Sequence, residues 1–308
     1  MKNRFCLSMQ LFLSISLCSV LTAMTPLAAR AAILVVDVDG LATATDCNAF
    51  GAAFSTIQAA ANAAAPGDTI QICPGTYNEQ VVVAKGNLTI RGSGAGATVL
   101  RPIIVANNTT TLLSGALAAP ILLVDRAANV TIANLTIDGS VADSGAILRA
   151  RCATAGFYMG IYYRNSSGTI DTAHVTNVTS STRCAEAIRA ESANILVTRN
   201  LIDHYAEAGV SCAASGTQCS IIGNTVRGQG PVSDQIQGGI TFRAQADGVI
   251  SGNVITDHFL IGAKGVLDSS VGVLLSDAVP PSNPHVLQEN VFANNQVNVQ
   301  RIGSAAAK

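Results

Sequence analysis

A short pattern centred on asparagine recurs through the second half of the chain and constrains the fold more than any other feature. In each unit a short apolar run precedes the asparagine, and β-forming residues follow it. The pattern is centred on Asn134, Asn200, Asn224, Asn253 and Asn290, with His174 in the same slot between the first two. Successive units are 24 to 40 residues apart, and the low end of this range matches one coil of three short strands. The repeat therefore predicts coils that stack on one another.

One helix is expected before the coils. Ser55 to Gln58 form a capping box, an alanine-rich run follows, and Pro66-Gly67 ends the helix near residue 65. Its surface is apolar nearly all round, so we expect it to cover the open edge of the first coil. No helical run separates the later strands, which argues against a doubly wound α/β fold. The sequence predicts an all-β fold, a single-stranded right-handed parallel β-helix over residues 32–308 with an N-terminal capping helix.

Residues 1–31 have the features of a cleaved secretory signal. Lys2 and Arg4 precede an apolar run, and Ala29-Arg30-Ala31 gives a small-x-small cleavage pattern. A retained membrane anchor is the alternative, but the run is short for a span and no stop-transfer pattern follows it. We therefore expect a secreted or periplasmic protein with no membrane span after signal cleavage.

The charge of the mature chain excludes one class of partner. Three of the 18 basic residues lie in the signal, which leaves 15 against 19 acidic residues. A mildly acidic chain without a basic run is a poor binder of nucleic acid. Twelve of the remaining basic residues are arginine, and arginine binds carboxylates in a bidentate way. Coding bias in an alanine-rich protein explains that ratio equally well.

Six cysteines remain after signal cleavage, and an even number in an exported chain indicates disulfide bonds. Stacked coils bring sequence neighbours together in space, and this favours three pairs. The expected pairs are Cys47–Cys73, Cys152–Cys184 and Cys212–Cys219. A metal site is the rival interpretation, but the chain has no C-x-x-C motif and no cluster of histidines.

Four N-terminal segments carry a resemblance to a known group of proteins. They are Phe54 to Ala60, Pro66 to Ile70, Pro74 to Glu79 and Leu88 to Gly92. Together they are similar to the N-terminal cap and first coil of exported members of the pectin-lyase-like superfamily. The later asparagine units resemble the repeats of carbohydrate-binding proteins and sugar hydrolases with this fold. The resemblance covers almost the whole mature chain and implies the fold, but the same scaffold carries lyases, hydrolases, esterases, epimerases and adhesins.

The catalytic motifs of these families match only in part. Gly75 to Glu79 resembles the G-x-Y-x-E pattern of pectin methylesterases, but their paired aspartates have no counterpart, so a structural turn is the better interpretation. Asp203, followed by His204, resembles a calcium-binding aspartate of pectate lyases and implies Ca²⁺ as the one candidate cofactor, although the family's tryptophan and R-x-P-x-x-R are missing. The chain also resembles periplasmic copper-maturation β-helices, but its mature part has one methionine, Met159, and four scattered histidines.

A row of polar residues on neighbouring strands gives the candidate site. Alternate residues of a strand face opposite sides, so inward aliphatic residues place a polar set outward on one stacked sheet. This set is Tyr162, Arg164, Arg189, Glu191 and Arg243. Removing the proton beside a uronate carboxyl requires a cation to neutralise that carboxylate and a base near the sugar ring. A solvated sheet face, with arginine stems covering apolar surface, is the alternative.

Two Asp-His pairs and the asparagines complete the polar pattern. Asp203-His204 and Asp257-His258 each follow a strand and could pair a proton-transfer group with an orienting carboxylate, though turn chemistry explains them too. We expect the asparagines to form an internal ladder that satisfies the turn backbone.

The leading hypothesis is an exported protein that binds an acidic polysaccharide and cleaves it by β-elimination. The alternative is a non-catalytic adhesion or carbohydrate-binding scaffold.

Overall fold

The structure is a computed structural model that describes residues 30–40, 42, 47, 54–140, 156–180, 184–233, 235–263, 265, 269–276 and 286–303. The chain divides into two compact units, Met1–Arg30 and Ala31–Lys308. The expected signal is almost entirely outside the described residues, so its cleavage stays a prediction. The described helix and strands all lie in the second unit.

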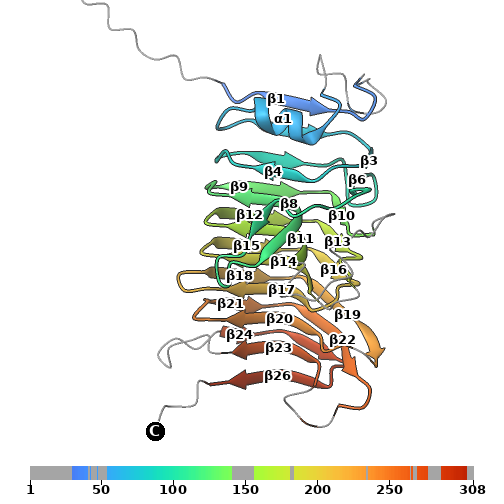
Figure 1. The fold of residues 1–308 in the computed structure, drawn as a ribbon, viewed down its shortest axis with the longest axis vertical. Helices are drawn as coiled ribbons and strands as arrows, with labels where there is room; N and C mark the ends of the chain where they lie inside the picture. Colours follow the sequence, from blue (N-terminus) through green and yellow to red (C-terminus); the bar gives the residue numbers. More distant parts are fainter. Residues whose placement is uncertain are drawn as a thin grey trace, which may run out of the picture. The chain divides into compact units, whose positions relative to one another are not determined.

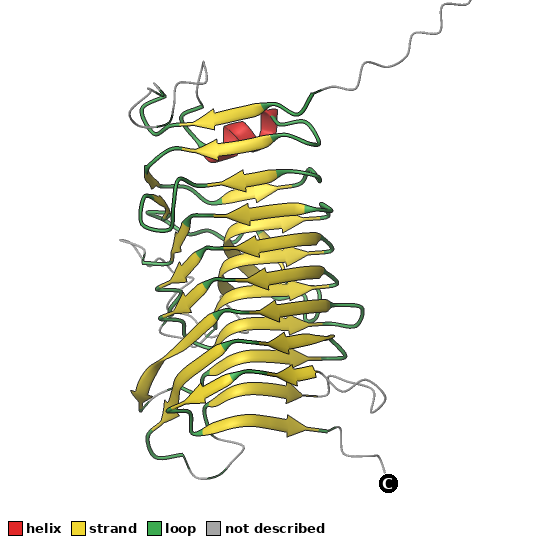
Figure 2. Cartoon of the chain, turned by 180° about the vertical axis from the view of Figure 1, so that it is seen from behind, coloured by secondary structure: helices red, strands yellow, loops and turns green. Residues whose placement is uncertain are grey.

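Apart from β7 (Thr109–Thr110), the described strands form three parallel sheets, and each of these strands pairs with one from a neighbouring coil (Figures 1 and 2). Sheet A contains β1 (Ile33–Val36), β2 (Thr69–Ile72), β5 (Thr89–Arg91), β9 (Val130–Ala133), β12 (Ser167–Asp171), β15 (Asn194–Thr198), β18 (Gln218–Ile222), β21 (Asp247–Ser251) and β24 (Val286–Gln288). Sheet B contains β3 (Gly75–Tyr77), β6 (Thr98–Leu100), β10 (Thr136–Asp138), β13 (His174–Thr176), β16 (Leu201–Asp203), β19 (Thr225–Val232), β22 (Val254–Leu260) and β25 (Val291–Ala293). Sheet C contains β4 (Val81–Val83), β8 (Leu117–Asp125), β11 (Phe157–Arg164), β14 (Ala185–Glu191), β17 (Ala208–Ala213), β20 (Gly238–Arg243), β23 (Val271–Ser276) and β26 (Val297–Ile302).

The chain therefore visits A, B and C in turn, and the fold is the expected right-handed parallel β-helix. Its core consists of aliphatic rows that run from coil to coil. In sheet C, Ile161, Ile188, Val210 and Ile240 pair in register, and all four are fully buried. Burying such a side chain contributes about 1.5 to 3 kcal/mol, so stacking supplies the stability that one coil lacks.

Helix α1 (Ile57–Ala63) follows β1 in the chain and packs against β4, β1 and β2 at the N-terminal end of the stack. It is two residues shorter at each end than the sequence indicates. Thr56 is the N-cap residue, and the Glu79 carboxylate accepts the backbone N–H groups of Ile57 and Gln58 at 2.7 and 3.0 Å. Glu79 ends the methylesterase-like pattern, so that pattern has a structural role here.

The asparagine ladder is present on the four later coils. Each side-chain Oδ1 of Asn224, Asn253 and Asn290 accepts the backbone N–H of the preceding asparagine, at 2.9 to 3.0 Å. Each Nδ2 donates to a backbone carbonyl of the preceding coil. The ladder begins at Asn200, which accepts from the N–H of Ala173.

The structure corrects the first two positions of the predicted repeat, Asn134 and His174. His174 pairs in register with Leu201 rather than with the asparagine before it, and Thr136 pairs with His174. The slot therefore holds Leu135 and Ala173 in these coils, one residue away from the positions that the sequence alignment indicates.

Two of the expected disulfides are confirmed. The Cα atoms of Cys47 and Cys73 are 5.1 Å apart, and those of Cys212 and Cys219 are 6.6 Å apart. Cys184 is also disulfide-bonded, and its expected partner Cys152 lies outside the described residues. No helix in the described ranges is long and apolar enough to cross a bilayer.

Candidate functional site

All five residues of the predicted polar row lie on the outer face of sheet C. Tyr162 pairs in register with Arg189, and Arg164 pairs with Glu191. Arg243 lies two coils further along the row that contains Glu191. The alternation of side chains thus identified one face correctly.

The structure corrects the predicted exposure of these five residues, because they do not form a solvent-exposed ribbon. Tyr162 and Glu191 are fully buried, and Arg189 is only 4% exposed. The side chains of Arg164 and Arg243 are 17% and 33% exposed, and each forms an ion pair with a carboxylate. A polyuronate therefore does not meet three free guanidinium groups here.

Arg189 is held between two glutamates. Its Nη1 donates to Glu186 Oε2 at 2.6 Å, and its Nε and Nη2 donate to Glu191 Oε1 at 3.0 and 2.5 Å. The Tyr162 hydroxyl donates to the other oxygen of Glu191. The guanidinium also lies over the ring of Phe157, 5.1 Å from its centroid. These contacts form one hydrogen-bonded network, called here the Arg189 network.

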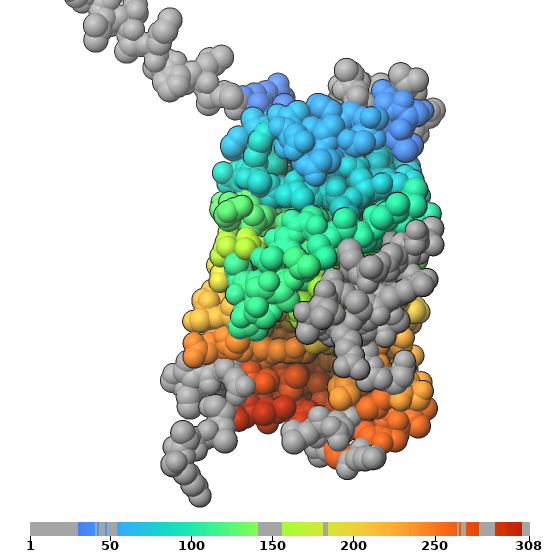
Figure 3. Space-filling model, in the orientation of Figure 1, coloured from blue at the N-terminus to red at the C-terminus, as the bar shows by residue number. Residues whose placement is uncertain are grey.

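A returning segment closes this network from water. Strand β7 (Thr109–Thr110) pairs antiparallel with β8, and the Leu112 N–H donates to the Glu191 carboxylate at 2.5 Å. Arg164 donates to the Thr110 carbonyl at 3.0 Å and binds Asp125 at 2.9 Å. In Figure 3 this segment, coloured green, covers part of the face.

Burial and charge fix the protonation states in the Arg189 network. Burial would lower the pKa of Arg189, but Glu186 and Glu191 raise it well above its usual value, so the guanidinium stays charged. Burial and the adjacent Glu191 raise the pKa of Tyr162, which stays protonated. Tyr162 therefore acts as a hydrogen-bond donor and not as a base at neutral pH.

Sheet C has a hollow beside the last described coils. It has a volume of about 170 Å³ and is lined by residues that include Glu207, Gln237, Thr241, Arg243, Leu274 and Gln300. Arg243 Nη1 lies 3.1 Å from Glu207 Oε1. We call this feature the Glu207 hollow.

A second polar cluster surrounds Asp203 at the end of β16. Its Oδ1 lies 3.1 Å from His174 Nε2 and 3.0 Å from His204 Nδ1, and its Oδ2 lies 3.2 Å from Arg227 Nη2. Burial would raise the pKa of Asp203, but hydrogen bonds from His174, Thr176 and His204 lower it well below its usual range. Asp203 therefore remains a carboxylate and accepts hydrogen bonds only.

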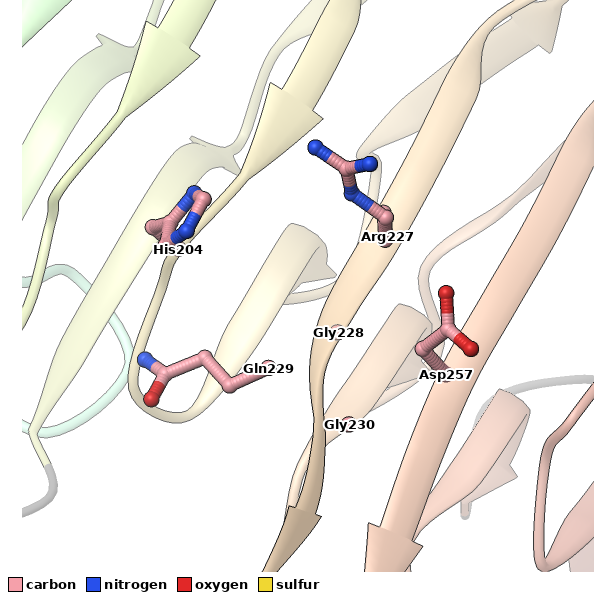
Figure 4. A pocket seen from close by; sticks show the side chains of 6 residues that line it. All are labelled: His204, Arg227, Gly228, Gln229, Gly230 and Asp257. Atoms are coloured by element: carbon pink, nitrogen blue, oxygen red, sulfur yellow. The ribbon is translucent and has the colours of Figure 1, made fainter.

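His204 faces solvent beside this buried carboxylate. The residue adopts the left-handed backbone conformation with φ of 49°, and its side chain is 58% exposed. It lines an open pocket together with Arg227, Gln229 and Asp257 (Figure 4). These residues follow β16 or belong to β19 and β22, so three consecutive coils contribute. We call this feature the His204 pocket.

The second Asp-His pair is arranged differently from the first. His258 points into the core, where Nδ1 lies 2.7 Å from Asn295 Oδ1 and Nε2 is hydrogen-bonded to the Tyr205 hydroxyl. Burial lowers the pKa of His258 to about 4. Asp257 bonds Thr256 at 2.9 Å instead. Only the first pair therefore presents an imidazole to a ligand.

Comparison with known proteins identifies the family. The sequence profile of the family described as "Periplasmic copper-binding protein (NosD)" matches residues 107–306. This chain belongs to the NosD family. The periplasmic family and the disulfides together support an extracytoplasmic location. A search of curated proteins gives no match.

Several solved structures resemble this NosD-family chain. Pectin methylesterase PemA from Erwinia chrysanthemi is 13% identical, with 83% of this chain and 92% of that chain covered and a TM-score of 0.49. Pectate lyase Pel9A is 12% identical, with 90% and 80% covered and a TM-score of 0.41. Alginate lyase from Paenibacillus sp. is 13% identical, with 87% and 99% covered and a TM-score of 0.36.

The described residues of this NosD-family chain do not fit a copper site. Copper favours thiolate, thioether and imidazole ligands. Met159 is fully buried beneath the segment that covers sheet C, and both ring nitrogens of His258 are hydrogen-bonded. In the part of the chain that the structure describes, no group of three His, Cys, Asp or Glu side chains could hold a metal ion. A calcium ion at Asp203 stays a prediction, and it would compete with Arg227 for the carboxylate.

Sequence reasoning missed several polar residues of both regions. Glu186 was missed because the consecutive residues Ala187 and Ile188 both face the core. The inward–outward alternation of side chains is therefore shifted by one residue at this point of β14. Glu207 lies just before β17, outside the strand pattern. Arg227 and Gln229 were missed although Asp203-His204 was considered, because their strand extends through Gly228, where the pairing with β22 shifts register.

Proposed function

We propose that this NosD-family protein binds an acidic polysaccharide in the His204 pocket and cleaves it by β-elimination. The observation that carries the proposal is the exposed imidazole of His204, which a buried carboxylate orients beside the Arg227 guanidinium. An open pocket with a base, an orienting acid and a cation provides the groups that this reaction needs.

The hydrogen bonds of Asp203 support His204 as the base in this proposal. Because Asp203 is a carboxylate, His204 Nδ1 must carry the proton that they share, which leaves the Nε2 lone pair toward the pocket. Nε2 then takes the proton from the carbon beside the uronate carboxyl. The electron pair forms a carbon–carbon double bond as the glycosidic C–O bond breaks, and the leaving oxygen takes a proton from solvent or from the imidazolium.

Arg227 supplies the charge that this step requires. Its Nη2 bonds Asp203, and its side chain is 48% exposed, so the rest of the fork can bind a ligand carboxylate. Neutralising that carboxylate stabilises the negative charge that develops as the proton leaves. Asp257, across the pocket, suits the hydroxyl groups of the same sugar.

A screen of polyuronates tests the proposal. The protein is incubated with polygalacturonate, polyglucuronate and alginate, and the ultraviolet absorbance of the unsaturated product is followed. Retention on each immobilised polymer at low salt is measured in parallel. Product from at least one polymer is expected. Retention without product would make the protein a binding module, and the absence of both would overturn the proposal.

A further inference from the structure

The Glu207 hollow lies on sheet C, whereas the His204 pocket lies at the ends of strands of sheet B. Its volume of about 170 Å³ equals the space of about six water molecules in the liquid, which suits one sugar ring and not a folded chain. Leu274 and Ile302 contribute apolar wall, against which the C–H face of a sugar can pack. In Figure 3 the surface is hollowed over the orange and red coils, below the green segment.

The polar groups of the hollow suit hydroxyl groups. Glu207 and Arg243 form a single ion pair at 3.1 Å, which leaves further acceptor and donor positions on both side chains. Thr241 is fully buried at the floor of the hollow and donates to the Val210 carbonyl at 3.5 Å, so Glu207 and Arg243 are the groups that a ligand can reach. The Glu207 carboxylate can accept a hydrogen bond from one hydroxyl of a diol, while the Arg243 guanidinium donates to the neighbouring hydroxyl.

Charge argues against a uronate at this position. Arg243 is already neutralised by Glu207, and the adjoining Arg189 network contains two glutamates for one guanidinium. Glu186 Oε1 is buried without a hydrogen-bond partner among the described residues. Burial and the nearby Glu186 raise the pKa of Glu207, which reports the same negative surroundings. A ligand carboxylate would be repelled, and an uncharged sugar would not.

The two features share a wall. Gln229 lines the His204 pocket and Gln237 lines the Glu207 hollow. Both side chains donate to the Tyr205 carbonyl, at 2.9 and 2.8 Å, and the Gln229 N–H donates to Gln237 Oε1 at 3.1 Å. These hydrogen bonds join the walls of the two features at the turn between β16 and β17.

We infer that the Glu207 hollow is a second sugar subsite, specific for an uncharged unit, and that the polysaccharide bound is a mixed one with acidic and neutral sugars. The acidic half of this inference rests on the proposed function of the His204 pocket. The neutral subsite stands on the hollow and its own charges.

Three classes of probe separate the two halves. Binding is measured by calorimetry for neutral oligosaccharides (xylo-, gluco-, manno- and galacto-oligomers), for oligogalacturonate, and for glucuronic-acid-substituted xylan fragments. The variants are Arg243→Gln and Glu207→Gln in the hollow and Arg227→Gln in the pocket. Arg199→Gln is the matched control, because Arg199 also has one carboxylate partner, Asp171, but is 67% exposed on sheet A. Circular dichroism checks that each variant is folded.

Arg243→Gln and Glu207→Gln should each weaken the best neutral oligomer about tenfold, the loss of one charge-assisted hydrogen bond. Both variants should leave the affinity for oligogalacturonate unchanged. Arg227→Gln should weaken oligogalacturonate binding and leave the affinity for the neutral oligomer unchanged. The mixed fragment should bind more tightly than either simple probe.

The inference is overturned if no neutral oligomer binds, or if folded Arg243→Gln and Glu207→Gln both match Arg199→Gln. If neutral oligomers bind through Arg243 but no acidic oligomer, including fragments of polyglucuronate and alginate, binds through Arg227, the neutral subsite stands while the proposed function and the mixed substrate fall.

Discussion

Arg189 on β14 of sheet C and Arg227 on β19 of sheet B each bond a carboxylate, yet only Arg227 is accessible to a ligand. Arg189 has two glutamates, a tyrosine against one of them, and a covering segment. Arg227 has one carboxylate partner, Asp203, which also bonds the imidazoles of His174 and His204. Its side chain is 48% exposed. The number of carboxylates and the presence of a cover, rather than the direction of the side chain, decide whether an arginine can bind a ligand.

The largest expected effect is on the stability of the covered region. Arg189→Gln leaves two buried glutamates without their cation, so it should lower the free energy of unfolding by about 3 to 5 kcal/mol. Arg199→Gln, at an exposed ion pair, should leave the free energy of unfolding nearly unchanged. Urea denaturation measures both. Equal midpoints for the two variants would show that the Arg189 network contributes no more than a surface ion pair.

The open region should show the opposite behaviour, with a large effect on turnover and a small one on folding. His204→Ala removes the proposed base, and general base catalysis contributes about 10² to 10⁴-fold. Product formation from the best polyuronate should therefore fall at least a hundredfold, while the urea midpoint stays near wild type. A variant that retains wild-type turnover would exclude His204 as the base.

The smallest expected effect compares the two histidines by pH. His258 has a folded pKa of about 4, below the unfolded value of about 6.5. Between these values the unfolded state binds more protons, so stability is full above pH 6.5 and is lost as the pH falls toward 4. From pH 7 to 5 this loss should be about 2 kcal/mol. In urea denaturation, His258→Gln should remove most of the difference in unfolding free energy between pH 7 and pH 5, whereas His204→Ala should retain it. If His258→Gln shows the wild-type difference, His258 is not the group whose protonation lowers the stability.

The sequence predicts the fold well because local rules determine it. The asparagine repeat indicates coils, the alternation of apolar residues indicates which face is inward, and the capping signal indicates the helix. These features depend on neighbours within one coil or between adjacent coils. The cysteine pairs follow from the same proximity, and two of them are observed.

Exposure could not be read from the same rules. The row from Tyr162 to Arg243 has the correct face, but its cover comes from β7 and Leu112, which lie far from Glu191 in sequence. The pairing of Arg189 with Glu186 depends on a local slip of alternation that side-chain type does not reveal. The Asp-His motif indicates His204 as a candidate from the sequence, whereas Arg227 lies on the next coil and is not part of that motif.

The asparagine ladder bears on how such a chain can change in length over evolution. Each rung accepts from the coil before it and donates back to that coil with the same two groups. A duplicated coil that carries its asparagine would thus meet matching partners on both sides, whereas a fragment of a coil would leave a buried amide unpaired. Gene duplication should therefore lengthen this stack in whole coils, and the residues inserted between coils are free to diverge into new binding surfaces.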